Sequence, residues 1–146
     1  MKDFADPSTD KDPFRSVVRA ANGSGKDKYI IAPCAVWLGT VYDDSLCIIT
    51  SASGNQLDRQ TDRYIQQLLN GINRIFDKQI WKLNYRHYTN LLNGSTIELF
   101  ATDEPGRAEG WHPATSNGQF GIFVSEAKSI GDDIFTALAR CTGFTK

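Results

Sequence analysis

Residues Ala20–Asp27 read Ala-Ala-Asn-Gly-Ser-Gly-Lys-Asp, a short glycine-bearing stretch that ends in a lysine and an aspartate. The adjacent valines within Phe14–Arg19 predict a short strand before it, and the apolar residues from Tyr29 to Val41 recur close to a helical period after it. Glycines let a backbone curl so that its N–H groups point at an anion, and the start of a helix adds positive potential. A strand, a glycine-rich turn and a helix in this order predict a phosphate-binding loop.

The spacing within this loop is that of a Walker A motif in which alanine replaces the first glycine. Four residues separate Ala20 from Gly25, and Lys26 follows, where a lysine reaches the outer phosphates as a point charge. The position after the lysine, which holds a hydroxyl residue in the motif, is Asp27 here. We predict a phosphate site with this one departure; the alternative is a surface turn. The residues assigned to the site are Ala20, Asn22, Gly23, Ser24, Gly25, Lys26 and Asp27.

The composition is that of one ordinary globular domain. The chain has 146 residues, of which 40% are hydrophobic and 23% charged, and no apolar run approaches the ~20 residues that cross a bilayer. Its 16 basic and 17 acidic side chains create no overall field that attracts nucleic acid. Three scattered cysteines fit a reducing compartment better than a disulfide framework or a zinc site. We expect a cytoplasmic protein without a membrane segment, with residues 1–13 a flexible arm and residues 14–146 the folded domain.

Alternating strand and helix patterns predict an α/β layered fold with a mainly parallel sheet. Two of the strands are continuous apolar runs, as in strands that are covered on both faces. A capping box at Ser53–Gln56 starts the most regular helical pattern, and another pattern covers Ile134–Cys141. Pro33 lies inside the first helical pattern, which predicts a kink or a late helix start. The predicted strands are Ser45–Ser51, Thr96–Ala101 and Phe120–Val124.

The stretch Asn73–Asn90 allows two interpretations. Four basic residues recur every four positions, interleaved with aromatic residues, and on a helix they would form a stripe suited to a nucleic-acid backbone. The alternative, which we favour, is a solvated helix end that runs into an irregular connection. The four residues are Arg74, Lys78, Lys82 and Arg86.

A second polar site is predicted where the strand Phe120–Val124 ends. Ser125 and Glu126 follow this strand directly. In an open α/β sheet, ligands bind at the carboxyl ends of the strands, so an acid at this position is a candidate for catalysis. The alternative is an acid that is merely exposed at the end of a strand.

Four segments of the chain taken together resemble a known family. In their order they resemble the N-terminal P-loop ATPase domain of phage large terminase subunits, over nearly the whole chain from Phe14 to Gly143. The glycine loop and the apolar strand ending in Glu-Ala are shared with many P-loop ATPases and helicases, whereas the pattern that runs from Glu126 to Gly143 is more specific to terminases. The segments are Ala20–Lys26, Leu46–Gln60, Ser95–Pro113 and Phe120–Gly143.

The resemblance implies a P-loop NTPase-like three-layer sandwich that binds Mg-ATP and, when complete, powers the translocation of viral DNA. It implies double-stranded DNA, the phage portal and the small terminase subunit as partners, a homo-oligomeric ring, and the cytoplasm of a bacterial host. Terminases continue to a further strand and a nuclease domain, whereas this chain stops at Lys146. We therefore expect an ATPase domain that is incomplete on its C-terminal side and has no nuclease activity. Arg74 and Arg107 are the candidates for an arginine finger.

Carried over to this sequence, Lys26 matches the phosphate-binding lysine and Glu126 the carboxylate that activates the attacking water. The family has Ser or Thr after the lysine and Asp before the glutamate, and both hold Mg²⁺; Asp27 and Ser125 stand there instead. The two residue types have exchanged places, which leaves the total charge of the pair unchanged. Our hypothesis is that Asp27 binds Mg²⁺ directly and Ser125 holds a metal-bound water. The alternative is a remnant gene whose metal ligands have drifted.

Two further functions stay open at this point. A helicase-like P-loop fragment would share the same loop. A catalytically inactive prophage remnant would keep the fold and serve only as an interaction module. Within the terminase interpretation, we expect ATP hydrolysis by this chain alone to be weak or absent.

Overall fold

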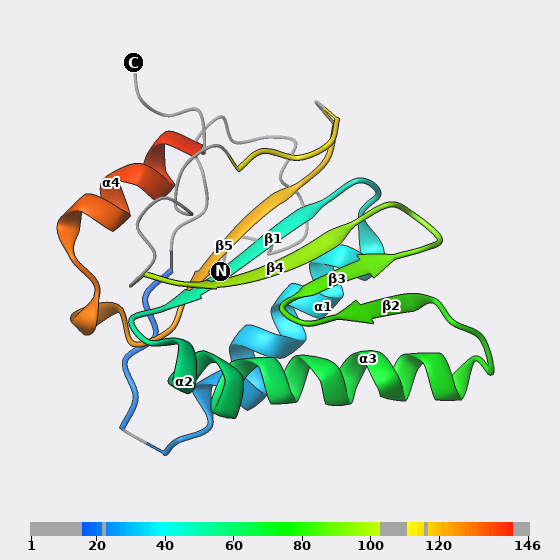
Figure 1. Cartoon of the computed structure of the whole chain (residues 1–146), viewed down its shortest axis with the longest axis horizontal. Helices are drawn as coiled ribbons and strands as arrows, with labels where there is room; N and C mark the ends of the chain where they lie inside the picture. Colours follow the sequence, from blue (N-terminus) through cyan, green and yellow to red (C-terminus); the bar gives the residue numbers. More distant parts are fainter. Residues whose placement is uncertain (1–15, 22, 103–110, 116, 142–146) are drawn as a thin grey trace.

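The computed structural model describes residues 16–21, 23–102, 111–115 and 117–141, so the predicted arm at residues 1–13 lies outside the described residues. A five-stranded sheet in the order β2-β3-β4-β1-β5 forms its centre, and helices cover both faces (Figure 1). The strands are β1 (Leu46–Ser51), β2 (Trp81–Asn84), β3 (His87–Asn90), β4 (Thr96–Ala101) and β5 (Phe120–Val124). The helices are η1 (Asp27–Ile31), α1 (Ala32–Val41), α2 (Gly54–Gln56), η2 (Leu57–Asp62), α3 (Arg63–Ile75), η4 (Ala127–Ser129) and α4 (Asp132–Cys141).

Strand β1 is the most deeply buried element, because it pairs in parallel with β4 on one side and with β5 on the other. All six of its residues are buried. Cys47 and Ile49 point into the core beneath α1 and α3, whereas Leu46 and Ile48 point into the core beneath α4. Since both faces of the strand are covered by helices, its sequence is continuously apolar from Leu46 to Ile49 rather than alternating. The three strands predicted from the sequence are confirmed.

Two hydrophobic cores lie on opposite faces of the sheet. The larger one joins α1, η2 and α3 to the sheet around Trp81, Tyr88 and Leu69, which are fully or almost fully buried. The smaller one packs Ile134 and Leu138 of α4 against the other face. Trp111 stacks on Phe100 in this second core, with the two ring planes 8° apart. Helices on both faces therefore give a layered mixed α/β fold.

The connection between α3 and β4 is a β-hairpin, which corrects both interpretations of Asn73–Asn90. Strands β2 and β3 pair antiparallel around Tyr85 and Arg86, and Arg86 has a left-handed backbone with φ 56°. Trp81 and Leu83 face the core beneath α3, so Lys82 and Asn84 point to the opposite face of the sheet. The predicted basic stripe is therefore split between two elements.

The hairpin also changes the character of the sheet. The pairs β1–β4 and β1–β5 are parallel, but β2–β3 and β3–β4 are antiparallel. The sheet is mixed rather than mainly parallel as predicted. The reason is the tight turn at Tyr85 and Arg86, since strands joined by two residues can only run antiparallel.

The segment before the glycine loop also differs from its prediction. Residues 16–21 form neither helix nor strand, and Val17 and Val18 are 84% and 50% exposed. After the loop, η1 is a wide π-type turn, and α-helical geometry begins only at Ala32. Pro33 has no N–H to donate to the preceding turn, which accounts for this late start of α1.

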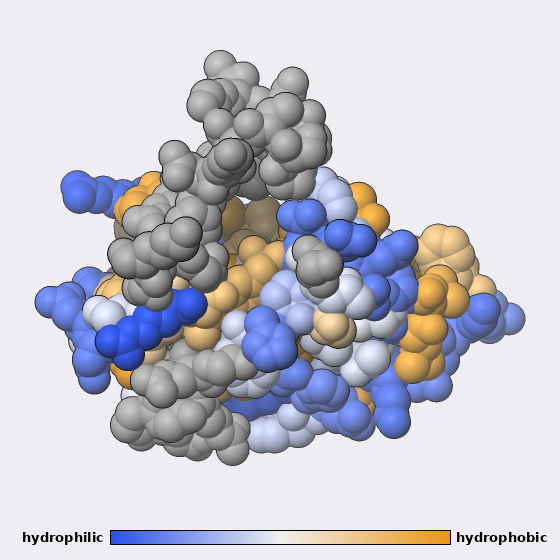
Figure 2. All heavy atoms as spheres, turned by 90° about the horizontal axis from the view of Figure 1, so that it is seen from above, coloured by the Kyte–Doolittle hydropathy of each residue, from blue (hydrophilic) through white to orange (hydrophobic). Residues whose placement is uncertain are grey.

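The surface of the described residues is mixed in polarity. Figure 2 shows hydrophilic and hydrophobic residues side by side on the face seen from above. Among the described residues there is no helix with the length and hydropathy required to cross a membrane.

Asn73 connects α3 to the hairpin and provides a test of this arrangement. Its amide Nδ2 donates to the carbonyl oxygen of Trp81 at 2.8 Å, and its Oδ1 accepts from the N–H groups of Ile80 and Trp81 at 2.9 and 2.8 Å. We predict that Asn73→Ala lowers the free energy of unfolding by about 2 kcal/mol, because it leaves backbone groups without partners. Urea denaturation measures this, and Asn70→Ala on the exposed face of the same helix is the matched control. Equal losses in both variants would contradict the prediction.

Candidate functional site

The glycine loop curls at the two positions where glycine is required. Gly23 and Gly25 have φ of 75° and 81°, a region that L-residues rarely adopt. A Cβ on Gly25 would lie 2.7 Å from the ring of Tyr29. Ser24 closes a turn by donating its N–H to Ala21, and Tyr29 donates to Gly25 to begin the helical region. The N–H groups of the first helical turn therefore have no acceptor within the helix itself and remain available to a ligand.

The loop wraps around the side chain of its own lysine. Lys26 Nζ donates to the carbonyl oxygens of Ala20 and Ala21 at 3.4 and 3.3 Å. These are long, exposed contacts to neutral acceptors, and they hold the ammonium group beside the backbone of the loop. The arrangement presents a cation and free N–H groups at the same place, which is the chemistry that an anion requires.

Asp27 connects this loop to the end of the sheet. Its carboxylate oxygen Oδ1 accepts a hydrogen bond from Thr61 Oγ1 at 2.6 Å and another from Ser125 Oγ at 2.8 Å. All three residues are buried. The structure thus brings together the two exchanged positions, which are 98 residues apart in the sequence. Asp27 Oδ2 accepts no hydrogen bond from any residue that the structure describes.

The polar cluster continues onto the end of β1. Ser51 is the last residue of this strand, and its hydroxyl is buried without a partner among the described residues. Because side chains alternate along a strand, Ser51 lies on the same face as Cys47 and Ile49, which is the face that α1 and η2 cover. Ser125 is joined to β1 by its N–H, which donates to the carbonyl oxygen of Thr50 at 2.8 Å. The carboxyl end of the sheet is therefore lined with hydroxyl groups.

Glu126 has a strained backbone at the end of the sheet. It follows Ser125 directly, is partly exposed, and has φ 54° and ψ 45° in the left-handed region. A residue with a Cβ pays a free-energy cost there, and such strain is concentrated at functional sites. The carbonyl oxygen of Glu126 accepts from Ser129 N at 2.9 Å, which begins the short helix η4. Glu126 is thus one residue away from the hydroxyl that binds Asp27.

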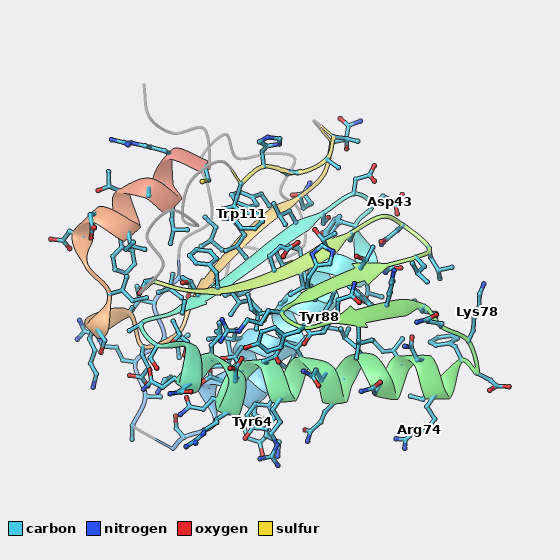
Figure 3. The ribbon with its side chains drawn as sticks, viewed as in Figure 1. Asp43, Tyr64, Arg74, Lys78, Tyr88 and Trp111 are labelled. Atoms are coloured by element: carbon cyan, nitrogen blue, oxygen red, sulfur yellow. The ribbon has the colours of Figure 1, made fainter. Side chains whose placement is uncertain are left out.

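Next to Thr61, Asp62 connects η2 to the hairpin. Its Oδ1 accepts from the Tyr88 hydroxyl at 2.5 Å, and its Oδ2 accepts from Gln66 at 2.8 Å. Burial raises the pKa of Asp62, although both hydrogen bonds favour the charged form. The pKa of Tyr88 is also raised, first by burial and then by its bond to this carboxylate. Figure 3 shows Tyr88 between β3 and α3.

A second carboxylate fixes the turn of the hairpin. Asp58 forms a bidentate pair with Arg86, with contacts of 2.9 and 3.0 Å, and it also accepts from the Tyr85 hydroxyl. The bond from Arg86 is the main reason why the pKa of Asp58 is lowered. The guanidinium also donates to the carbonyl oxygen of Gly54 at 3.1 Å. Arg86, predicted as part of a basic stripe, is instead neutralised by Asp58.

The structure thus places some of the predicted residues together and leaves others undescribed. Asp27 and Ser125 meet at the carboxyl end of the sheet, with Lys26 and Glu126 as their neighbours in the chain, while the Lys26 ammonium contacts the carbonyl oxygens of its own loop. Asn22 and Arg107 lie outside the described residues, and Arg74 is exposed on α3. Thr61 was not predicted. The sequence does contain an indication that Thr61 is buried: it lies four residues after Leu57 and four before Ile65, which is a core position of the helical pattern.

The residues at this site suit one hard cation held together with a ligand. No group of three or more His, Cys, Asp or Glu side chains that could hold a metal by itself is found among the described residues. Mg²⁺ normally needs fewer protein ligands, since it binds one or two carboxylates and takes its other oxygens from phosphates and water. Asp27 has one carboxylate oxygen free for this purpose, and the hydroxyls of Ser51 and Ser125 suit metal-bound water.

Comparison with known proteins gives a structural likeness and no sequence match. No family model matches the chain, and no curated protein matches it. Among solved structures, the chain is similar to the large terminase from the thermophilic bacteriophage D6E, with a TM-score of 0.62 and 14% sequence identity. The likeness covers 84% of this chain and 29% of the phage protein. The chain therefore has a terminase-like fold.

The two hydroxyls on Asp27 give a first test of the site. We predict that Thr61→Val, which keeps the shape of the side chain, lowers the free energy of unfolding by about 1–3 kcal/mol, because a buried carboxylate loses a donor. Denaturant titration measures the loss. Thr136→Val on the exposed surface of α4 is the control, and its change should stay within about 0.5 kcal/mol. A Thr61→Val variant as stable as the control would contradict the role assigned to this bond.

The raised pKa of Asp62 predicts a dependence of stability on pH. Because the carboxyl group binds its proton more tightly in the folded chain, the folded state carries more protons between the unfolded pKa, about 3.9, and the higher folded pKa. The contribution of Asp62 to stability is therefore largest at low pH and is lost as pH rises through this window. We expect the unfolding free energy of the wild type minus that of Asp62→Asn to decrease from pH 4 to pH 7. Urea titrations at stepped pH measure the difference, and a constant or rising value would contradict the assignment.

Proposed function

We propose that this chain is a terminase-type P-loop ATPase module that binds Mg-ATP. The observation that carries the proposal is the hydrogen bond of 2.8 Å between Asp27 and Ser125, which unites the glycine loop with the end of β5. The likeness to a phage large terminase supports the same assignment, at the level of the fold. On this proposal, the layered sheet is a P-loop NTPase-like sandwich with its nucleotide at the carboxyl end.

Lys26 and the N–H groups of the loop bind the phosphates. Residues from Ala20 to Asp27 form the cradle, and the Lys26 ammonium leaves its two carbonyl acceptors for phosphate oxygens. This exchange is favourable because charge-assisted hydrogen bonds are about twice as strong as bonds to neutral acceptors. The start of the helix contributes further positive potential.

Asp27 makes the metal necessary. A carboxylate next to a phosphate would repel it, and two unit charges ~4 Å apart at an effective dielectric near 20 cost about 4 kcal/mol. If Mg²⁺ is bound, Asp27 would hold it through its Oδ2 atom, which accepts no hydrogen bond from a described residue, and the ion would offset the repulsion. Ser125 holds a water of the metal. Nucleotide binding is therefore expected to depend on Mg²⁺ more strongly than at a site with a neutral hydroxyl.

Glu126 orients and deprotonates the attacking water. Its place directly after Ser125 and its left-handed backbone support this role. Hydrolysis by the chain alone is weak, because no arginine is assigned to stabilise the charge that develops on the transferred phosphoryl group. In the complete assembly, the module would act in a homo-oligomeric ring on double-stranded DNA, with the portal and the small terminase subunit as partners.

A thermal-shift measurement with ATP, ADP and Mg²⁺ varied separately tests the proposal. We predict that Mg-ATP stabilises the wild type by about 2.7 kcal/mol at a ligand concentration of 100 times Kd, and that ATP without Mg²⁺ stabilises it much less. Lys26→Ala should abolish the shift. Lys28→Ala removes the same charge two residues away and should keep it. If Lys26→Ala responds like the wild type, the loop is a surface turn and the proposal fails.

The role of Asp27 and Ser125 in metal binding is tested by swapping the two residue types between the two positions. The double variant Asp27→Thr with Ser125→Asp restores the arrangement of the family, and each single variant leaves the pair with two carboxylates or with none. We expect both single variants to lose the Mg-ATP shift and the double variant to recover it. If both single variants bind as well as the wild type and the double variant gains nothing, the exchange has no role in metal binding. Folding without any nucleotide response in the wild type and the double variant would favour the inactive interaction module.

A further inference from the structure

The outer face of α3 carries a polar hollow that the nucleotide site does not use. A cavity of about 660 Å³ opens there, lined by Asp58 and by side chains on one face of the helix. Gly71 contributes to the hollow, because a Cβ at this position would have no atom within 4 Å. The residues of α3 that line the hollow include Arg63, Gln67, Asn70, Gly71 and Arg74.

Cations extend this hollow in both directions along the helix. Arg59 precedes Arg63 by four residues and Arg74 follows it by eleven, so these three project from the same side, whereas Lys78 lies in the turn after α3. All are exposed, and none makes an ion pair with a residue that the structure describes. Figure 3 shows Arg74 pointing away from the sheet.

The acidic residue inside the hollow does not cancel this charge. Both carboxylate oxygens of Asp58 are held by Arg86 at 2.9 and 3.0 Å, so Asp58 is paired with a fifth cation from the hairpin. Asp62, the next acid along η2, is buried and bonded to Tyr88 and Gln66. The surface of the hollow therefore presents guanidinium groups that form no ion pair with a described residue, together with the amides of Gln67 and Asn70.

We propose that this face, from Arg59 to Arg74, binds the phosphate backbone of double-stranded DNA. Guanidinium groups fit phosphate in a bidentate manner, and amide side chains donate to phosphate and sugar oxygens. Arg63 and Arg74 are eleven residues apart, about 16 Å along a helix, which exceeds the ~12 Å width of the major groove. The two arginines can therefore contact phosphates on both sides of a groove.

The lining of the hollow favours nucleic acid over an acidic peptide. Peptide-binding surfaces anchor their partners with aromatic or aliphatic side chains in apolar pockets. No apolar side chain lines this hollow within the described residues, apart from the bare backbone at Gly71. Contacts to the phosphate backbone need only donors and positive charge, which gives binding without sequence preference.

This site rests on the proposed function for the identity of its partner, but it uses a different surface from the nucleotide. The phosphate loop lies at the amino end of η1, whereas the hollow lies on the outside of α3. The two proposals can therefore be tested independently. A variant of the hollow that still shows the Mg-ATP thermal shift but no longer binds DNA would show that the two sites are separate.

The test is fluorescence anisotropy of the full chain with a labelled 20-base-pair duplex at several salt concentrations. For Arg63→Gln with Arg74→Gln, we expect binding to weaken about tenfold at low salt, equally for two unrelated sequences. The slope of log K against log salt should fall by about 2, because each phosphate contact contributes about 0.9. Circular dichroism and thermal unfolding confirm that the variant is folded, and the conservative pair Arg63→Lys with Arg74→Lys should retain most of the slope.

Lys82→Gln with Lys128→Gln is the matched control, since it removes two charges elsewhere and Lys82 lies on the opposite face of the sheet from α3. We expect it to change the slope by less than half as much. Equal effects of both double variants would overturn the proposal, because only net charge would then matter. Unchanged DNA binding in the arginine variant, or displacement of DNA by poly-glutamate at equal charge concentration, would overturn it as well.

Discussion

The carboxylate of Asp27 is the contact on which the candidate site depends. One oxygen atom accepts hydroxyls from η2 and from the end of β5, at 2.6 and 2.8 Å, so that three segments of the chain meet at a single buried charge. On the proposed assignment, in which the two residue types have exchanged places, a bond between these two positions can form in either arrangement. A hydroxyl donates to a carboxylate whichever element supplies which partner. The exchange can therefore keep the geometry of the site while it moves the negative charge from the strand to the loop.

The parts of the fold that could be predicted are those whose signals are local. Strand β1 is apolar at nearly every position because helices cover both of its faces, and Ser53 caps the next helix by accepting from Gln56 N at 3.4 Å. The hairpin could not be predicted in this way. The alternation of Trp81 and Leu83 covers only four residues, and the longer basic repeat in the same stretch suggests a helix instead. The expected strand before the loop failed for a related reason. An apolar pair such as Val17 and Val18 becomes a strand only where a neighbouring strand pairs with it.

The site was predicted unevenly for the same reason. The loop depends on glycines with positive φ, a property that a short motif reveals. The contact between Asp27 and Ser125 spans 98 residues and could be inferred only from the order of strands and helices. Thr61 was missed, although it lies in the series Leu57, Thr61, Ile65 at core spacing. A hydroxyl in a core position needs a buried partner, and this one has the carboxylate of Asp27.

The short π-type element η2 places two successive side chains, Thr61 and Asp62, on two different partners. Thr61 holds the glycine loop through Asp27, and Asp62 holds the hairpin through Tyr88. Because α3 continues directly from η2, the helix that carries the cationic face begins at the residue after Asp62. The glycine loop, the hairpin and the start of α3 are therefore held together by one short element.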